Sequence, residues 1–328
     1  SSDTGAFQTR NALDTGSQSG SRLGFKGEEA LGGGNKIGFL LETGLAVDTQ
    51  STGIFSSTNR QSFLYAAGSW GTVAAGRQYT PQFNMLAAID PFGVGTSGDA
   101  LYGRGVYVMG TAVAPTTIRL DNLFAYVSPN FGGLTVTAGY TANGVGDEAS
   151  TATGAQSANY KIWAINPVYA NGPIYAALNY HKVKQDSTGL DNGVWDIGGT
   201  YNFGVVKLAA VIGQNKATST AVTDEAKAKQ WLLGATVPVG AAGNVLVSYA
   251  RNKIETAKAN KWALGYTHDL SKRTNLYAVY TKISTNDDAE GFFSTNGASG
   301  AWSTATGDFT NTGKDYTSGL NIGVRHTF

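Results

Sequence analysis

The chain ends in Gly319-Leu320-Asn321-Ile322-Gly323-Val324-Arg325-His326-Thr327-Phe328. Successive side chains of a strand point to opposite faces, so this stretch predicts a strand with two different faces. One face carries Leu320, Ile322, Val324, His326 and Phe328, and the other carries Asn321, Gly323, Arg325 and Thr327. A chain that ends in such a strand presents a hydrophobic edge that must be paired. The simplest partner is the other end of the same sheet, which predicts a closed barrel.

The same two-residue period runs through most of the chain. Clear examples are 134–140, 206–213, 231–237 and 262–268, in which apolar and small or polar residues alternate. Alternation of this kind is typical of strands with two different faces. No stretch shows a sustained helical period, and the best helix candidate is the short piece Asp224–Gln230. The sequence therefore predicts an all-β protein.

The connections between the predicted strands alternate between short and long. The long polar links fall near 48–59, 80–115, 144–157, 186–191, 217–227, 254–260 and 286–316. Tight turns at one end and longer loops at the other are typical of a transmembrane antiparallel up-and-down β-barrel. The strands also exceed the about 5–6 residues usual in soluble sheets and match the about 9–11 residues of a tilted membrane span. Aromatic residues near the strand ends match the two aromatic girdles of such a barrel.

The composition excludes several other classes of protein. The net charge is +1, which argues against a nucleic-acid-binding protein. Only 14% of residues are charged, against about 25% in typical soluble domains. The sequence has no Cys, and its three His are far apart, so we expect no metal site and no cofactor. Ser, His and Asp occur without any pattern that brings them together, so we expect no enzyme.

The strand count is uneven. About fifteen strands start near Gly20 and end at Phe328, whereas single-chain bacterial barrels have an even number. We therefore expect a single barrel domain over residues 1–328 with sixteen strands. The first strand would precede Ser1 or come from another piece of polypeptide. The polar start of the sequence is not a signal peptide, so we expect a mature form from which one has been removed.

Several motifs resemble the general porins of Gram-negative bacteria, in the group found in beta-proteobacteria. The closest match is Arg119-Leu120-Asp121-Asn122-Leu123-Phe124-Ala125-Tyr126-Val127-Ser128-Pro129-Asn130-Phe131-Gly132-Gly133. The stretches 19–29, 31–42, 75–78 and 270–277 and the C-terminal strand complete the resemblance. The family's opening strand has no counterpart here.

The resemblance implies an outer-membrane homotrimer, in contact with lipid and lipopolysaccharide, with one pore in each subunit. The third loop of such porins folds into the barrel and narrows it, and here that constriction loop would be about 80–115. A C-terminal aromatic strand is also the signal read by the assembly machinery of the outer membrane, a role that would fall to Phe328.

Strand alternation predicts which charged residues face the pore. If Leu23, Phe25, Ile37, Phe39 and Leu41 face lipid, then Arg22, Lys26 and Glu42 face inward. If Phe63, Tyr65, Leu120 and Phe124 face outward, then Arg60, Arg119 and Asp121 face inward. Arg77 has outward parity unless a bulge intervenes, and Asp90 and Asp99 on the third loop would oppose the arginines.

Arg22, Arg60 and Arg119 are the strongest candidates for the constriction, because the resemblance places arginines at matching positions in anion-selective relatives. Guanidinium groups stay charged and would draw anions through the pore. A plainer interpretation is that they only pair with carboxylates such as Glu42 and Asp121. The sequence thus predicts a porin for passive diffusion of small hydrophilic solutes and ions, with anion preference. The alternative is a substrate-selective channel or an adhesive, ligand-binding barrel that acts through its external loops.

Overall fold

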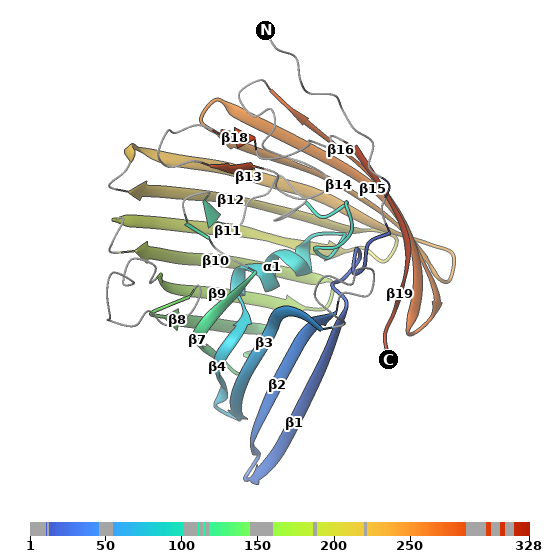
Figure 1. The fold of residues 1–328 in the computed structure, drawn as a ribbon. Coiled ribbons are helices and arrows are strands. Elements are labelled where there is room, and N and C mark those ends of the chain that lie inside the picture. Colours follow the sequence, from blue (N-terminus) through green and yellow to red (C-terminus); the bar gives the residue numbers. More distant parts are fainter. Residues whose placement is uncertain are drawn as a thin grey trace.

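The main feature of the fold is one antiparallel sheet of fifteen strands (Figure 1). The computed structural model describes residues 11, 13–45, 55–100, 110–111, 114–115, 118–144, 160–185, 189–219, 222–286, 300–302, 309–311 and 318–328. Each strand of this sheet pairs with the one before it, in the order β1-β2-β3-β4-β7-β8-β9-β10-β11-β12-β13-β14-β15-β16-β19. The sheet curves strongly, so it has a concave and a convex face (Figure 1).

The strands of this sheet vary from eight to eighteen residues in length. The first seven strands of the sheet are β1 (Arg22–Gly32), β2 (Asn35–Leu45), β3 (Phe55–Gly68), β4 (Gly71–Tyr79), β7 (Arg119–Val127), β8 (Leu134–Thr141) and β9 (Lys161–Asn171). The other eight are β10 (Ile174–Gln185), β11 (Leu190–Asn202), β12 (Lys207–Ser219), β13 (Val222–Val239), β14 (Gly243–Ile254), β15 (Ala257–Ser271), β16 (Thr274–Thr285) and β19 (Ser318–His326). Two short hairpins are not paired with the sheet: β5 (Gly110–Thr111) with β6 (Ala114–Pro115), and β17 (Gly300–Trp302) with β18 (Phe309–Asn311).

The predicted all-β meander of about fifteen strands is confirmed. The helix predicted over Asp224–Gln230 is wrong, because these residues belong to β13. The links predicted over 217–227 and 254–260 are also too long, since β12 and β13 pair as far as Ser219 and Val222, and β14 and β15 as far as Ile254 and Ala257. Pairing with a neighbouring strand outweighed the local polarity of both segments. A sixteenth strand stays a prediction.

The two faces of the sheet differ as the alternation predicts. On β12 and β13 the convex face carries Ile212 and Leu233, which are 51% and 55% exposed. The concave face of the same strands carries Val211 and Leu232, which are buried. An exposed apolar convex face is what a barrel presents to lipid.

A helix covers part of the concave face. α1 (Pro81–Ile89) follows β4 and lies inside the curve of the sheet, where it contacts β9, β10, β11 and β12 (Figure 1). Its start is well defined, because the Thr80 side chain accepts a hydrogen bond from the amide of Phe83 and Pro81 takes the first helical position. Among the described residues, no helix is long and apolar enough to cross a membrane.

The core of the molecule lies between α1 and the sheet. Met85, Leu86 and Ile89 of α1 are each 1% exposed. They pack in one cluster with side chains of the concave face, namely Ala177, Ala209, Val211, Leu232, Ala250, Ala259 and Ile283. Full burial of a side chain of this size is worth roughly 1.5–3 kcal/mol, so these three residues hold α1 firmly against the sheet. We call residues 80–100, which contain α1, the inner segment.

Candidate functional site

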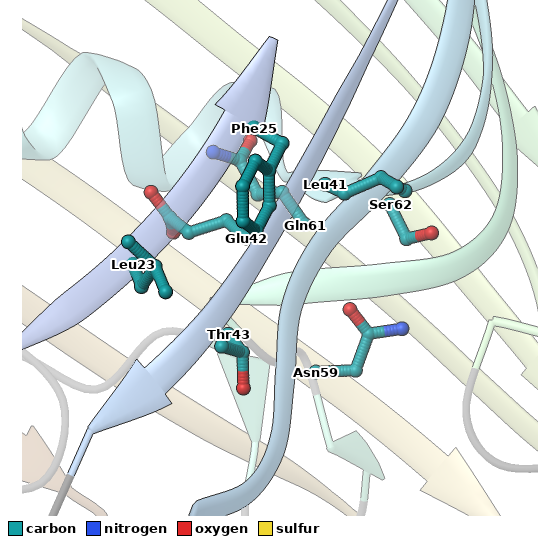
Figure 2. A pocket seen from close by; sticks show the side chains of 8 residues that line it. All are labelled: Leu23, Phe25, Leu41, Glu42, Thr43, Asn59, Gln61 and Ser62. Atoms are coloured by element: carbon teal, nitrogen blue, oxygen red, sulfur yellow. The ribbon is translucent and has the colours of Figure 1, made fainter. Parts of the chain in front are cut away.

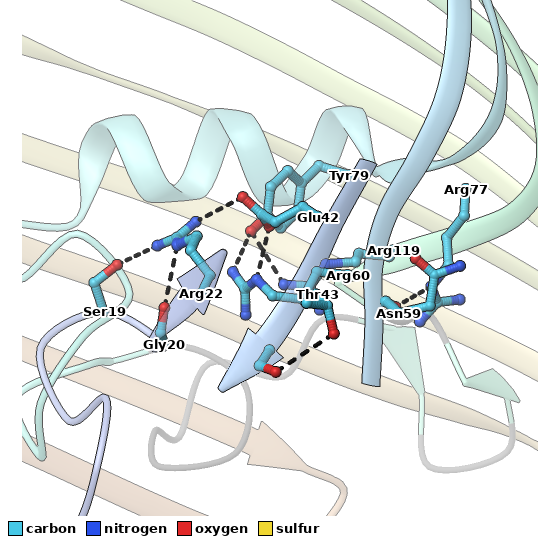
Figure 3. Close-up of polar contacts among 11 residues, drawn as sticks. Ser19, Gly20, Arg22, Glu42, Thr43, Asn59, Arg60, Arg77, Tyr79 and Arg119 are labelled. Carbon is cyan, nitrogen blue, oxygen red and sulfur yellow. Dashed lines mark hydrogen bonds and ion pairs between the residues drawn. The ribbon is translucent and has the colours of Figure 1, made fainter. Parts of the chain in front are cut away.

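Two arginines meet at one tyrosine, Tyr79, directly before the inner segment. Arg60 and Arg119 each donate a hydrogen bond from Nη2 to the Tyr79 hydroxyl oxygen, at 2.7 and 3.0 Å (Figure 3). The Arg119 guanidinium also lies over the Tyr79 ring, 4.6 Å from its centre. The Tyr79 ring in turn stacks on Phe83 of α1, with ring centres 4.7 Å apart. Tyr79 therefore links two guanidinium groups to the helix that crosses the concave face.

The same group of side chains contains one carboxylate. Glu42 accepts a hydrogen bond from Arg60 Nε at 2.7 Å and lies 3.6 Å from Arg22 Nη1. Arg22 also donates to the carbonyl oxygen of Gly20 and to the Ser19 hydroxyl (Figure 3). Three guanidinium groups and one carboxylate give this arginine cluster (Arg22, Glu42, Arg60, Tyr79 and Arg119) a formal charge of +2. Arg119 is in part desolvated, whereas the Arg22 side chain stays 34% exposed.

Arg77 and Asp121 form a separate ion pair instead of joining this cluster. Arg77 also donates from Nε to the carbonyl oxygen of Asn59. The bulge beside Arg77 lies in β7 and not in β4, so Arg77 pairs regularly with Ser62 and keeps its outward parity. Lys26 pairs across the strands with Leu40, on the Glu42 face of β2, and is exposed. The structure therefore brings together four of the predicted residues, Arg22, Glu42, Arg60 and Arg119.

Two of the predicted strand orientations are wrong. The alternation predicts that Phe63 and Tyr65 face outward, but the Tyr65 hydroxyl donates to Glu28, on the same face as Glu42, and Leu64 is 62% exposed instead. Arg60 still reaches Glu42 because β3 has an extra residue there, opposite the Glu42/Thr43 step of β2.

Leu120 is also predicted to face outward, and it is 3% exposed. It belongs to a buried cluster with Ile162, Val183 and Leu190 on the concave face. The cause is a bulge in β7, where three steps from Leu120 to Leu123 match two steps of β4. Within this bulge Asn122 has φ 53°, a left-handed conformation that interrupts the alternation.

Asp90 and Asp99 lie in the inner segment, but the structure does not bring them to the arginines. Asp90 is 5% exposed and ends α1, where its carboxylate accepts hydrogen bonds from the amides of Phe92 and Val94. The carbonyl oxygen of Asp99 accepts a hydrogen bond of 2.6 Å from Nζ of Lys261 on β15. Burial raises the pKa of Asp90 to about 6, and the positive charge of Lys261 opposes that rise.

A second polar contact fixes α1 to the sheet. Nε2 of Gln82 donates to the Asp196 carboxylate on β11 at 2.7 Å, and Nδ2 of Asn179 on β10 donates to the same oxygen at 3.1 Å. The same Asn179 amide nitrogen lies 3.1 Å from Nδ1 of His181. All four side chains are buried. Since a carboxylate only accepts, Asp196 fixes the orientation of both amides.

A cavity of about 360 Å³ lies next to the arginine cluster, along β1, β2 and β3. Its lining residues are Leu23, Phe25, Leu41, Glu42, Thr43, Asn59, Gln61 and Ser62 (Figure 2). Glu42 is the one charged residue in this lining, and its carboxylate is engaged by Arg60 and Arg22. Most of this lining, including Leu23, Phe25 and Leu41, belongs to the opposite face of the sheet from Glu42, so the cavity adds no charge to the arginine cluster.

Sequence reasoning missed Tyr79, Lys261 and Asp196. Tyr79 had a usable signal, because it is the last residue of β4 and directly precedes the Thr80-Pro81 start of α1. Lys261 and Asp196 contact residues 162 and 114 positions away in the sequence, which no local pattern indicates.

Phe328 is fully exposed beyond the end of β19.

Comparison with known proteins gives consistent matches. Residues 1–289 match the family described as Gram-negative porin. The chain is 35% identical over 327 residues to outer membrane porin protein 32 of Delftia acidovorans, covering 98% of this chain and 89% of that protein. It is 30% identical over 313 residues to an outer membrane porin protein of Bordetella pertussis, covering 82% of this chain and 78% of the other.

A solved structure agrees with these matches. The anion-selective porin from Comamonas acidovorans superposes with a TM-score of 0.75 at 30% identity, covering 96% of this chain and 91% of the other. Porins are channels and not enzymes, and these relatives are outer-membrane proteins. The family match over most of the chain and the two long alignments place this protein in the Gram-negative porin family of the outer membrane.

Proposed function

We propose that this porin lets small hydrophilic solutes and ions diffuse passively through its barrel and prefers anions. The observation that carries the proposal is the arginine cluster, in which Arg22 and Arg60 engage the single carboxylate of Glu42 and Arg119 joins them through Tyr79. A charge of one sign inside a narrow protein wall raises the local concentration of ions of opposite sign. The name of the Comamonas relative, an anion-selective porin, supports the same preference.

The proposed constriction lies between the arginine cluster and the inner segment, within the loop of about 80–115. Tyr79 supports this position, because it contacts Arg60, Arg119 and Phe83 of α1 at the point where the chain leaves β4. Arg22, Arg60 and Arg119 would attract the anion, and Glu42 would moderate their charge. Lys26, Arg77, Asp90, Asp99 and Asp121 would act from a greater distance. Homotrimer assembly, with one pore per subunit and lipid around it, and Phe328 as the assembly signal complete the proposal.

The test is the reversal potential of the channel in a planar bilayer under a salt gradient. We expect Arg119→Ala to lower the ratio of anion to cation permeability roughly 2–5-fold, as one charge removed at close range in a water-filled pore predicts. The matched control is Arg273→Ala, which removes the same charge at the exposed turn between β15 and β16. Cation preference of the unmodified channel would contradict the anion preference, and an unchanged ratio in Arg119→Ala would remove this residue from the site.

The alternative function through external loops depends on the link 286–316. Apart from Asn286 and the short strands β17 and β18, that link lies outside the described residues. A conductance that saturates with one solute and is blocked by it would favour a substrate-selective channel over passive diffusion.

A further inference from the structure

The convex face of β9 to β16 carries a row of aromatic residues near the ends that lie opposite the tight turns. The row consists of Trp163, Tyr180, Trp195, Trp231, Tyr249, Trp262 and Tyr280. Several of its members touch across neighbouring strands, with ring centres 5.2–5.3 Å apart in the pairs Trp163–Tyr180, Trp231–Tyr249 and Trp262–Tyr280. Rows of Trp and Tyr on a membrane barrel mark the level where hydrocarbon meets headgroups. This aromatic row therefore fixes the height of one membrane surface.

A row of cations lies directly beyond the aromatic row. On five strands the next residue on the convex face, two positions further from the tight turns, is Lys161, Lys182, Lys229, Arg251 or Lys282. The order of the two residue types reverses with strand direction, from Lys-Ile-Trp and Lys-Gln-Trp in β9 and β13 to Tyr-His-Lys, Tyr-Ala-Arg and Tyr-Thr-Lys in β10, β14 and β16. Antiparallel neighbours need this reversal to hold the cations at one level, about 7 Å above the rings.

One part of the cation row is hollowed, and the described residues that line the hollow include no carboxylate. A cavity of about 490 Å³ on β11 to β14 is lined by Trp195, Ile212, Gly213, Gln214, Lys229, Gln230, Trp231, Arg251 and Lys253. Lys229 lies directly opposite Lys253, and Trp231 lies opposite Arg251. Like charges placed opposite each other on a sheet destabilise it unless an anion lies between them. In the described part of the chain, Lys182 and Lys184 have such an anion in Asp191, whereas none lines the cavity.

We propose that this cavity binds the phosphorylated headgroup of an outer-leaflet lipid. Lys229, Arg251 and Lys253 would hold the phosphate oxygens, since Arg and Lys are the side chains that bind phosphate in a fork or as a point charge. Trp231 and Trp195 would lie beside the sugar or glycerol backbone, and the acyl chains would follow Ile212 and Leu233, which are exposed on the convex face. The cations lie at the level of the lipid phosphate, the aromatic rings at the level of its backbone, and the aliphatic residues at the level of its acyl chains.

The experiment measures lipid binding to the full-length protein in detergent by native mass spectrometry. The probes are bisphosphorylated lipid A, the same lipid without phosphates, and inorganic phosphate. We expect the triple variant Lys229→Gln, Arg251→Gln, Lys253→Gln to bind bisphosphorylated lipid A on the order of 100-fold more weakly, from the contribution of about three basic residues at an anionic surface. The dephosphorylated lipid is expected to bind the unmodified protein as weakly as the triple variant binds lipid A.

The matched control removes three cations from the opposite rim, in the variant Lys272→Gln, Arg273→Gln, Arg325→Gln. Unchanged lipid A binding in this control supports the proposal, and an equal loss in both variants overturns it by showing a general charge effect. Inorganic phosphate that binds as tightly as lipid A would also overturn it, because the cavity would then be a site for the free anion. Loss of subunit assembly in the first variant, with lipid binding intact, would overturn it too and show that this face contacts another subunit instead.

Discussion

The concave face of this porin has two walls that line the same predicted pore but differ in how far their charged side chains are exposed. We call β1 to β4 the arginine wall, since the arginine cluster extends across them to Arg119 of β7. We call the concave face of β9 to β16 the packed wall, because the inner segment lies on it. On the arginine wall the charged side chains keep part of their exposure, as the 34% of Arg22 shows. On the packed wall even charged residues such as Lys261 and Asp196 are buried.

The difference between the two walls shows that the alternation of a strand determines the face on which a side chain lies but not its exposure to water. Strand parity selects the face of the sheet on which a side chain lies, and both walls obey it apart from the bulges. Whether that side chain meets water depends on where the inner segment packs. The segment is fixed to one wall by an apolar cluster and two polar anchors, Lys261 and Asp196, and touches the other through Tyr79. The charge available to a permeating ion therefore comes from the arginine wall.

The largest expected effect is that of replacing Lys261, which anchors the inner segment to the packed wall. In Lys261→Met the inner segment loses the hydrogen bond to the Asp99 carbonyl and the positive charge near Asp90. Removing one partner from a buried hydrogen bond of a charged group costs about 2–3 kcal/mol, here in the free energy that holds residues 90–100 to the sheet. Hydrogen exchange of the inner segment would measure the loss. The control is Lys207→Met, which replaces an exposed lysine of β12 and should change hydrogen exchange little. Equal exchange in both variants would contradict the anchoring role of Lys261.

A rise in pH should weaken the docking of the inner segment on the packed wall. Because burial raises the pKa of Asp90 to about 6, the docked segment binds a proton that the undocked segment, with an ordinary pKa near 4, has already lost. The free energy of docking should therefore be greatest below about pH 4, fall by about 2–3 kcal/mol as pH rises from 4 to 6, and stay constant above. Exchange rates corrected for intrinsic pH effects would show this, and Asp90→Asn should remove the dependence.

The second anchor should have a smaller effect. Asp196→Asn makes the orientation of the Gln82 and Asn179 amides ambiguous and weakens a charged acceptor, at a cost of about 2 kcal/mol. Local exchange of α1 is again the measurement. Asp191→Asn, on the same strand but paired with Lys182 on the convex face, should cost less than about 1 kcal/mol. An Asp191 variant with the larger effect would show that the buried contact does not hold α1.

The smallest expected effect is a change of ion selectivity at the arginine wall. Glu42→Gln removes the one carboxylate of the arginine cluster, so the ratio of anion to cation permeability should rise roughly 2–5-fold. Glu28→Gln provides the control, since Glu28 lies on the same face but is paired with Lys36 and Tyr65 nearer the tight turns. A rise of the same size in both variants would mean that the net charge of the wall, and not the cluster, sets the selectivity.

Sequence reasoning predicted the fold and half of the site for physical reasons that can be named. The two-residue period is a property of each strand, so the meander and the concave positions of Arg22 and Glu42 followed from local pattern. The period fails where a bulge inserts one residue, and Leu120 was misplaced because the left-handed backbone of Asn122 has no strong signal in its sequence. The contacts of Lys261 and Asp196 depend on how the inner segment folds back, which alternation does not describe.

The mirrored order of aromatic and basic residues on the convex face has a consequence for topology. Three residues suffice to state the direction in which a strand crosses the membrane: a cation before the ring in β9 and β13, and a ring before the cation in β10, β14 and β16. The strand polarity of a circular permutant, or of a chimaera of two such barrels, can therefore be checked from its tripeptides alone. A reversed tripeptide would place lysine among acyl chains, where one cation costs about 2–4 kcal/mol.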